Sequence, residues 1–165
     1  MTFRAASRSA RETEALGELL GSLASPGLVV ALQGPLGAGK TVFTKGVARG
    51  LGVPAPRYVS SPTFTIHKSY RGRLDLHHLD LYRLSEPAEL EDLGLEDALV
   101  GVGVCVIEWP DFFFEVLPPE RVLVRFALSS PEERVLEFEP SGVKPRAIVE
   151  RLAECWRERE TEEKR

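Results

Sequence analysis

The apolar positions along the chain follow two patterns, and each pattern predicts a different kind of element. Residues 28–33 form a short, continuous apolar run that is typical of a buried strand. After it, Phe43, Val47 and Leu51 recur at helical spacing. A second apolar run over residues 102–107 has the character of a central parallel strand. Such strands beside helices predict an α/β fold.

A helix is predicted near the start of the chain. Residues 9–12, Ser-Ala-Arg-Glu, have the form of a capping box, in which the Ser9 side chain caps the helix and Glu12 reaches back to the capping residue. One face of the helix then carries Leu16, Leu19, Leu20 and Leu23. This apolar face predicts packing against the core.

Another helix is predicted at the end of the chain, starting near Pro145. Its core-facing residues are Ile148, Val149, Leu152 and Trp156. The helix is expected to end where the run of charged residues begins at Arg157. We therefore expect one domain over residues 1–156 and a solvated charged tail over residues 157–165.

Alternating polar and apolar residues predict a first hairpin. Residues 63–70 would pair with residues 73–84 across an Arg-Gly turn. Strict alternation places Asp75 and Asp80 on opposite faces of the second strand, unless a bulge at residues 77–78 intervenes. One of these two acids is expected to face the functional site.

A second hairpin is predicted from residues 121–128 and 134–138, and we expect it at the far edge of the sheet. Two short helices are predicted between the hairpins. The first covers residues 86–93 with Ser85 as its N-cap, and the second covers residues 95–99.

Composition narrows the class of protein. Hydrophobic residues make up 43% and charged residues 28% of the 165 positions, which is ordinary globular usage. With 21 Lys and Arg against 25 Asp and Glu, the net charge of -4 excludes the broad basic surface of an autonomous nucleic-acid binder. Any RNA would therefore be bound only indirectly, through a partner.

Cysteine usage and hydropathy indicate a cytoplasmic protein. Cys105 and Cys155 lie far apart without a Cys-x-x-Cys spacing, so they are interpreted as reduced thiols and not as a zinc site. The chain carries no apolar run of signal-peptide or membrane-spanning length, and no membrane association is expected.

The strongest motif lies between the first apolar strand and the helix that follows it. Residues 34–41, Gly-Pro-Leu-Gly-Ala-Gly-Lys-Thr, fit the P-loop spacing of Gly, four residues and Gly-Lys-Thr. Glycines let successive backbone N–H groups approach phosphates, and the helix begins with its positive end at the anion. The alternative is a glycine-rich turn without a ligand. The predicted ATP-binding residues are Leu36, Gly37, Ala38, Gly39, Lys40 and Thr41.

A magnesium site is predicted beside the P-loop. The Thr41 hydroxyl is a Mg²⁺ ligand in such motifs, and Glu108 ends the second apolar strand as a Walker B acid does. Asp111 competes for this role, but it lies beyond Pro110, which turns the chain away from the strand. Glu108 is the preferred ligand.

The connector after the P-loop helix contains several hydroxyl residues, of which Ser61, Thr63 and Thr65 are the candidates for a role at the site. They are typical of a switch that orders around the γ-phosphate and Mg²⁺, and equally of a simple turn that enters a strand. His67, His77 and His78 lie nearby, and surface or strand-face histidines are favoured over a metal cluster because phosphate-bound Mg²⁺ prefers oxygen ligands.

The order of the motifs resembles that of the TsaE (YjeE) ATPases over nearly the whole chain. The resemblance rests on residues 36–41, on Ser-Pro-Thr-Phe-Thr at 61–65, on His-Leu-Asp-Leu-Tyr-Arg-Leu at 78–84 and on Glu-Trp-Pro at 108–110. It implies a P-loop NTPase-like three-layer fold with a mixed central sheet flanked by helices. It also implies a bacterial cytosolic ATPase that supports formation of threonylcarbamoyladenosine (t6A) beside the tRNA anticodon, with TsaD and TsaB as partners.

The resemblance also implies roles for individual residues. Thr41 and Glu108 match Mg²⁺ ligands, Thr63 matches a switch threonine, and Asp80 matches an acid needed for hydrolysis, so Lys40, Thr63 and Asp80 are the predicted catalytic residues. Thr13 resembles a position near the adenine. The chain departs from the family at two positions, Pro35 and Val42. Neither touches a required contact, so the departures affect only details of affinity.

Other nucleotide-binding classes fit less well. A GTPase needs an Asn-Lys-x-Asp or Thr-Lys-x-Asp segment, and the Thr-Lys at residues 44–45 lacks the Asp. A small P-loop kinase needs an acceptor pocket and an arginine-rich lid, and no compact arginine cluster follows the core strands. A nucleotide-gated binding module remains the main alternative to an ATPase that is weak alone and stimulated by partners.

Overall fold

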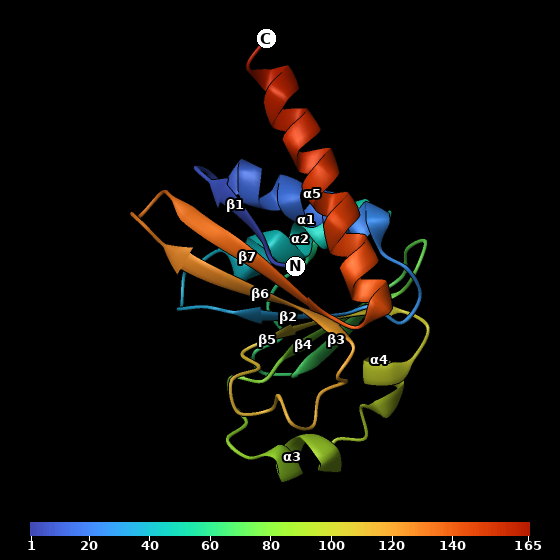
Figure 1. Cartoon of the computed structure of the whole chain (residues 1–165). Coiled ribbons are helices and arrows are strands. Elements are labelled where there is room, and N and C mark those ends of the chain that lie inside the picture. The colour runs from blue at the N-terminus through green and yellow to red at the C-terminus, as the bar shows by residue number, and fades with distance from the viewer.

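The computed structural model describes residues 1–165 as one seven-stranded sheet with helices on both faces (Figure 1). Its strands are β1 (Phe3–Ser7), β2 (Val29–Gln33), β3 (His67–Tyr70), β4 (Leu76–Asp80), β5 (Val104–Glu108), β6 (Arg121–Leu128) and β7 (Arg134–Ser141). Its helices are α1 (Ala10–Leu23), α2 (Lys40–Gly50), α3 (Pro87–Asp92), α4 (Glu96–Val100) and α5 (Val143–Glu163), with a 3-10 turn at Pro56–Tyr58.

The sheet is mixed, with the order β1-β7-β6-β2-β5-β4-β3. The pairs β2–β5, β2–β6 and β4–β5 are parallel, and the pairs at both edges are antiparallel. The two apolar runs recognised in the sequence form β2 and β5, which are buried and lie side by side at the centre. The predicted α/β fold with a mixed central sheet is therefore confirmed.

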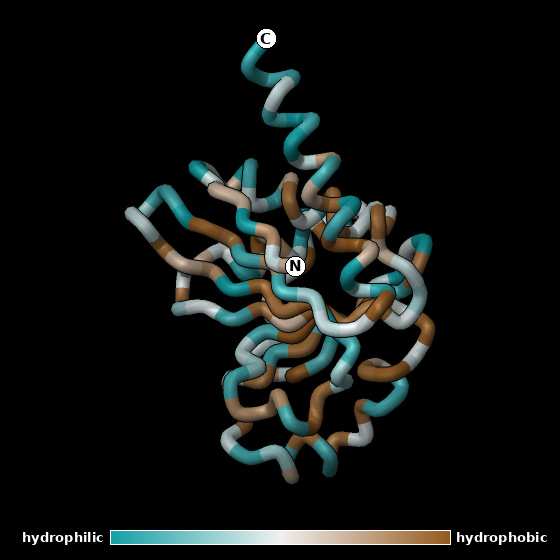
Figure 2. The backbone as a smooth tube through the Cα atoms, viewed as in Figure 1, coloured by the Kyte–Doolittle hydropathy of each residue, from teal (hydrophilic) through white to brown (hydrophobic).

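Two hydrophobic clusters divide the molecule into three layers. The larger one joins one sheet face to α1, α2 and α5, and includes Leu16, Phe43 and Phe138. The smaller one joins the other face to α3 and the segment before β6, and includes Leu90 and Phe113. Hydrophobic residues are concentrated in the sheet between the two helical layers, whereas the outer end of α5 is hydrophilic (Figure 2).

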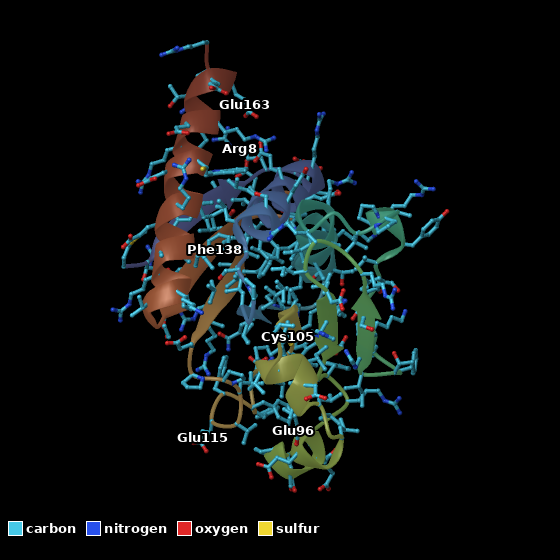
Figure 3. The ribbon with its side chains drawn as sticks, turned by 90° about the vertical axis from the view of Figure 1, so that its right-hand side faces the viewer. Arg8, Glu96, Cys105, Glu115, Phe138 and Glu163 are labelled. Carbon is cyan, nitrogen blue, oxygen red and sulfur yellow. The ribbon has the colours of Figure 1, made fainter.

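The side-chain view shows the same division from another direction (Figure 3). Cys105 lies inside the sheet, Phe138 lies beside α5, and Glu96 lies on the layer that contains α4. Neither Cys105 nor Cys155 forms a disulfide, as the sequence predicted. No helix combines the length and the hydropathy that crossing a bilayer requires.

Helices α1 and α2 pack closely because glycines occupy their contact. A Cβ on Gly17 would collide with the carbonyl oxygen of Phe43, and a Cβ on Gly46 would collide with that of Glu14. Each helix therefore carries a glycine where the other's backbone passes. This contact fixes α2, and with it the P-loop at its N-terminus, on the body of the protein.

The Gly46→Ala variant is expected to be strongly destabilised, because its methyl group meets backbone and not a flexible side chain. Overpacking of this kind costs about 3 kcal/mol, which lowers the melting temperature of a domain of this size by roughly 6–12 °C. Thermal unfolding measures the shift. Lys45→Ala, the neighbouring change on the same helix, is the control; an equally small shift in both variants would contradict the close packing.

Several elements differ from the sequence-based expectation. The pattern did not predict β1, which pairs with β7 and takes the sheet edge expected for the second hairpin. Residues 63–66 form a turn and β4 ends at Asp80, so the first hairpin is shorter than predicted. The register of β4 with β5 is regular, and no bulge occurs at residues 77–78. Helix α5 continues through Glu163, because salt-bridged charged residues extend it beyond the core.

One of the two predicted helix caps is confirmed and the other needs correction. Ser9 caps α1 by accepting from the Glu12 N–H, but the Glu12 carboxylate accepts from the Arg8 N–H, one residue before the expected one. Ser85 does not cap α3, which has Glu86 at its N-cap; the Ser85 hydroxyl instead donates to Glu89. The N-cap of α1 is therefore confirmed, and only the N–H reached by Glu12 and the cap of α3 differ by one residue from the prediction.

Candidate functional site

A cleft of about 460 Å³ opens at the carboxyl ends of the central parallel strands. Strands β2, β4 and β5 run in the same direction, so the segments that follow Gln33, Asp80 and Glu108 meet at one edge of the sheet. The cleft is lined by residues 36–42 and by Ser61, Thr63, Asp80, Tyr82, Glu108, Trp109 and Arg134. Open α/β sheets bind their ligands at this position.

The P-loop forms a cradle of backbone atoms at the floor of the cleft. Gly37 and Gly39 have φ of 78° and 102°, a left-handed region that favours glycine. A Cβ on Gly39 would lie 2.7 Å from the Arg134 guanidinium nitrogen Nη1. Helix α2 begins directly after Gly39 without a side-chain cap. Its first N–H groups and its dipole therefore point into the cleft, where they would stabilise an anion.

Lys40 carries its charge into the cleft without a carboxylate bound to it. Its ammonium group donates to the Gly34 carbonyl at 2.7 Å and lies 3.1 Å from the centre of the Trp109 ring. Burial lowers the pKa of Lys40, and the charges of Glu108, Asp111 and Asp80 oppose that shift. A phosphate is the kind of anion that such a partly desolvated ammonium group binds.

Trp109 reaches the ammonium group through an unusual backbone. Its φ is 58°, which side-chain-bearing residues rarely adopt, and Pro110 follows it. The Tyr82 ring packs against it with ring centres 5.1 Å apart. Strained backbone of this kind is concentrated at functional sites.

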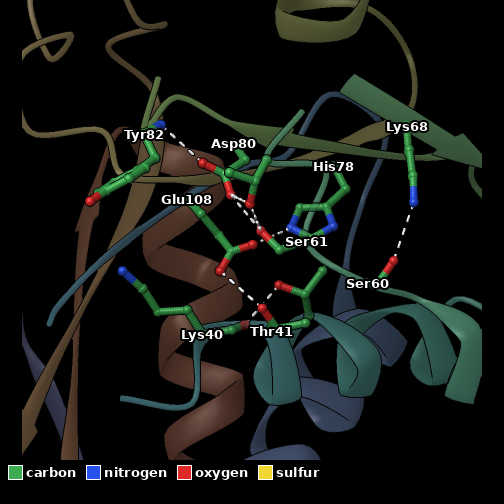
Figure 4. A network of polar contacts seen from close by, with 11 residues as sticks. Lys40, Thr41, Ser60, Ser61, Lys68, His78, Asp80, Tyr82 and Glu108 are labelled. Atoms are coloured by element: carbon green, nitrogen blue, oxygen red, sulfur yellow. Dashed lines mark hydrogen bonds and ion pairs between the residues drawn. The ribbon is translucent and has the colours of Figure 1, made fainter. Parts of the chain in front are cut away.

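The P-loop and the end of β5 meet through oxygen atoms. The Thr41 hydroxyl donates to Glu108 Oε1 at 3.3 Å, and Glu108 Oε2 accepts from His78 Nε2 at 2.6 Å (Figure 4). Hydroxyl and carboxylate oxygens are the donors that Mg²⁺ prefers, so this pair fits the metal. Asp111 is exposed and instead accepts from the Gln33 side chain at 2.9 Å. The geometry therefore favours Glu108 over Asp111.

Asp80 connects the end of β4 to the connector loop. Its Oδ2 accepts from Thr63 at 3.0 Å and from the Ser61 hydroxyl, while its Oδ1 accepts from the Tyr82 N–H at 2.9 Å (Figure 4). Only 2% of Asp80 is exposed. Because two loop hydroxyls are held by one acid at the cleft wall, movement of this loop is coupled to Asp80.

The structure brings most of the predicted residues together, but not all. Thr65 is exposed and does not line the cleft. Thr13 is buried, and its hydroxyl is already bound to Ser7 at 2.7 Å and donates to the Ser9 carbonyl. Its methyl carbon lies 3.5 Å from where a Cβ on Gly39 would stand. Thr13 therefore supports the P-loop from behind, and its predicted contact with the adenine stays a prediction.

The three histidines lie on different sides of the sheet. His67 Nε2 and His77 Nδ1 are 3.1 Å apart, and burial, followed by the charges of His77 and His78, lowers the pKa of His67. His78 is fully buried on the opposite face of β4, in contact with Glu108. The expected strand-face position is confirmed for His78, but no sequence pattern predicts its contact with Glu108.

Tyr82, Trp109 and Arg134 line the cleft without a role predicted from the sequence, and the buried His78 contacts Glu108 at its wall. Arg134 starts β7 and donates from Nη1 to the Ala38 carbonyl at 2.7 Å, so it holds the P-loop across 96 positions of sequence. Its partner could not be found without the order of the strands. Trp109 and His78 belong to short motifs whose roles become visible only when β4 and β5 are placed side by side.

Comparison with known proteins gives one consistent family. The family model described as "Threonylcarbamoyl adenosine biosynthesis protein TsaE" matches residues 7–136. The tRNA threonylcarbamoyladenosine biosynthesis protein TsaE of Bacillus subtilis (strain 168) is 45% identical over 143 residues, which cover 86% of this chain and 88% of that protein. The protein of the same name from Treponema pallidum (strain Nichols) is 46% identical over 122 residues, covering 74% and 89%.

A solved structure supports the same relationship. The crystal structure of Bacillus subtilis YdiB is similar to this chain with a TM-score of 0.78 and 35% sequence identity. The match covers 93% of this chain and 95% of that one. The agreement therefore extends over most of both chains.

Proposed function

The chain belongs to the TsaE family of threonylcarbamoyl adenosine biosynthesis proteins, and from this premise we propose that it binds and hydrolyses ATP with Mg²⁺ in the cleft. The hydrolysis would support t6A modification of tRNA in the cytoplasm, with TsaD and TsaB as partners. The tRNA would be held by the partners, in keeping with a net charge of -4.

One observation carries the proposal. Three chemical groups line the same cleft. Lys40 provides an ammonium group to which no carboxylate is bound, Thr41 and Glu108 provide an oxygen pair suited to Mg²⁺, and Asp80 is an acid that holds the connector loop. Phosphoryl transfer depends on these three functions, which are charge neutralisation, metal binding and positioning of the attacking water. A glycine-rich turn without a ligand would need none of them.

Each residue has a physical role in this mechanism. The α2 N–H groups and the Lys40 ammonium group bind the phosphates and stabilise charge on the transferred group. Mg²⁺, held by Thr41 and Glu108, would neutralise the β- and γ-phosphates. Asp80 orients the attacking water, or the loop that positions it, through Ser61 and Thr63.

The Glu108→Gln variant tests the metal site. We expect the gain in ATP affinity on adding Mg²⁺ to fall by at least about tenfold, because an amide oxygen is a weaker ligand than a carboxylate. A Mg²⁺ titration of nucleotide binding measures the gain. The matched control is Asp111→Asn, which should behave as wild type; the reverse pattern would move the metal to Asp111.

Phosphate release from ATP tests the proposed activity as a whole. We expect slow release from the chain alone, since Arg134, the arginine that lines the cleft, donates to the Ala38 carbonyl, and faster release with TsaD and TsaB. A heat-treated partner mixture is the control. Nucleotide binding without release under either condition would contradict the ATPase and favour a nucleotide-gated binding module.

A further inference from the structure

We propose that His78 is a positioning residue, which fixes the Glu108 carboxylate so that its other oxygen stays beside Thr41 for the metal. The inference rests on the proposed Mg²⁺–ATP function. The motif at residues 78–84 begins with His78 but gives it no role, and only the fold places its ring against Glu108.

The contact is short and shielded from water. His78 Nε2 lies 2.6 Å from Glu108 Oε2, and the side chains are 0% and 3% exposed. An ionised carboxylate can only accept, so Nε2 must carry the hydrogen and donate. This bond takes up Oε2 and leaves Oε1 for the Thr41 hydroxyl, 3.3 Å away (Figure 4). One carboxylate is thus oriented from both sides.

The strand register makes this orientation rigid. β4 and β5 are parallel neighbours, with His78 opposite Val106 and Asp80 opposite Glu108. His78 and Asp80 are two residues apart, so they share one face of β4. The same strand therefore presents one side chain to the metal-binding acid and one to the connector loop, and both are held by a central strand and not by a loop.

The other ring nitrogen shows that packing alone does not explain this residue. His78 Nδ1 is buried and has no hydrogen-bond partner. A buried polar atom without a partner costs stability, and an apolar side chain of similar size would avoid that cost. What His78 provides is the donor to Glu108. Outer donors of this kind orient metal-binding side chains, and their loss lowers metal affinity about 10–100-fold.

Two variants separate positioning from packing. His78→Leu removes the donor and approximately keeps the volume, whereas His78→Gln keeps an N–H donor on a flexible side chain. The affinity of each variant and of wild type for a non-hydrolysable ATP analogue is measured by calorimetry, once with Mg²⁺ and once with EDTA. The ratio of the two affinities is the gain that the metal provides.

We expect His78→Leu to lose roughly tenfold of this gain while its affinity in EDTA stays unchanged, and His78→Gln to recover much of it. An unchanged gain in His78→Leu, or an equal fall of both affinities, would overturn the positioning role. If the wild type shows no gain from Mg²⁺, the proposed function fails as well. If only the variant result fails, the proposed function stands.

A measurement on the wild type covers the case in which His78→Leu does not fold. Nitrogen-15 NMR of the histidine rings distinguishes the two neutral tautomers. The inference requires hydrogen on Nε2 of His78, the nitrogen that faces Glu108. A ring with its hydrogen on Nδ1 alone would leave nothing to donate to Oε2, and would overturn the proposal.

Discussion

Replacing Lys40 with alanine is expected to abolish tight binding of ATP. The Lys40 ammonium group is bound only to the Gly34 carbonyl and the face of Trp109, so its charge is available to the phosphates. Charge-assisted hydrogen bonds in a shielded site contribute more than neutral ones, and their loss corresponds to a roughly 100-fold weaker affinity. Calorimetry with ATP and Mg²⁺ measures the change.

The control for this variant is Lys45→Ala, on the same helix but outside the cleft. It removes an equal charge, so a general electrostatic effect would weaken both variants to a similar extent. If ATP bound Lys40→Ala as tightly as wild type, the P-loop would not be the phosphate site, and the proposed function would be wrong.

Asp80→Ala is expected to keep nucleotide affinity and to lose hydrolysis. Asp80 contacts the connector loop through Ser61 and Thr63 and forms no hydrogen bond with Lys40 or Thr41. Positioned acids and bases contribute about 10²–10⁴-fold to such reactions, so we expect a fall of at least about 100-fold in the partner-stimulated rate. Phosphate release with TsaD and TsaB present measures it, and calorimetry measures the affinity.

Asp75→Ala provides the matched control, because Asp75 lies just before the same strand and is exposed. It should hydrolyse ATP at the wild-type rate in the presence of the partners. Hydrolysis by Asp80→Ala at the wild-type rate would show that this acid only holds the loop in place. If the wild-type rate did not rise on adding TsaD and TsaB, the proposed stimulation by these partners would be wrong.

The parts of the fold that the sequence predicted are those coded locally. The P-loop, β2 and α2 follow one another within about twenty positions, and each has its own period, turn residues or apolar run. The buried strand that ends at Glu108 was recognised for the same reason. Local patterns predict an element reliably when the residues that cause it to form lie within one stretch of the chain.

The turn at residues 63–66 shows where local patterns fail. Its residues alternate as a strand would, but Thr63 is directed at Asp80, and Ile66 has φ of 67° and accepts from the Asp80 N–H. The polar positions of this segment thus serve the cleft and not a strand face. Alternation alone does not distinguish these two uses.

The missed residues depend on strand order, which no local pattern gives. Arg134 meets the P-loop because β7 returns beside β6, and His78 meets Glu108 because β4 and β5 are neighbours. β1 was missed because its apolar pattern is too short to predict a strand. It forms a strand by pairing with β7, where the Phe3 and Phe138 rings stack with their centres 5.6 Å apart. These contacts are long-range products of the fold.

A crystal structure with Mg²⁺ and a non-hydrolysable ATP analogue tests the central claim most directly. We expect the triphosphate to lie on the P-loop against Lys40, with the metal held by Thr41 and Glu108. We expect the γ-phosphate to face Asp80. The analogue outside this cleft, or a metal bound by Asp111 with Glu108 turned away, would contradict it.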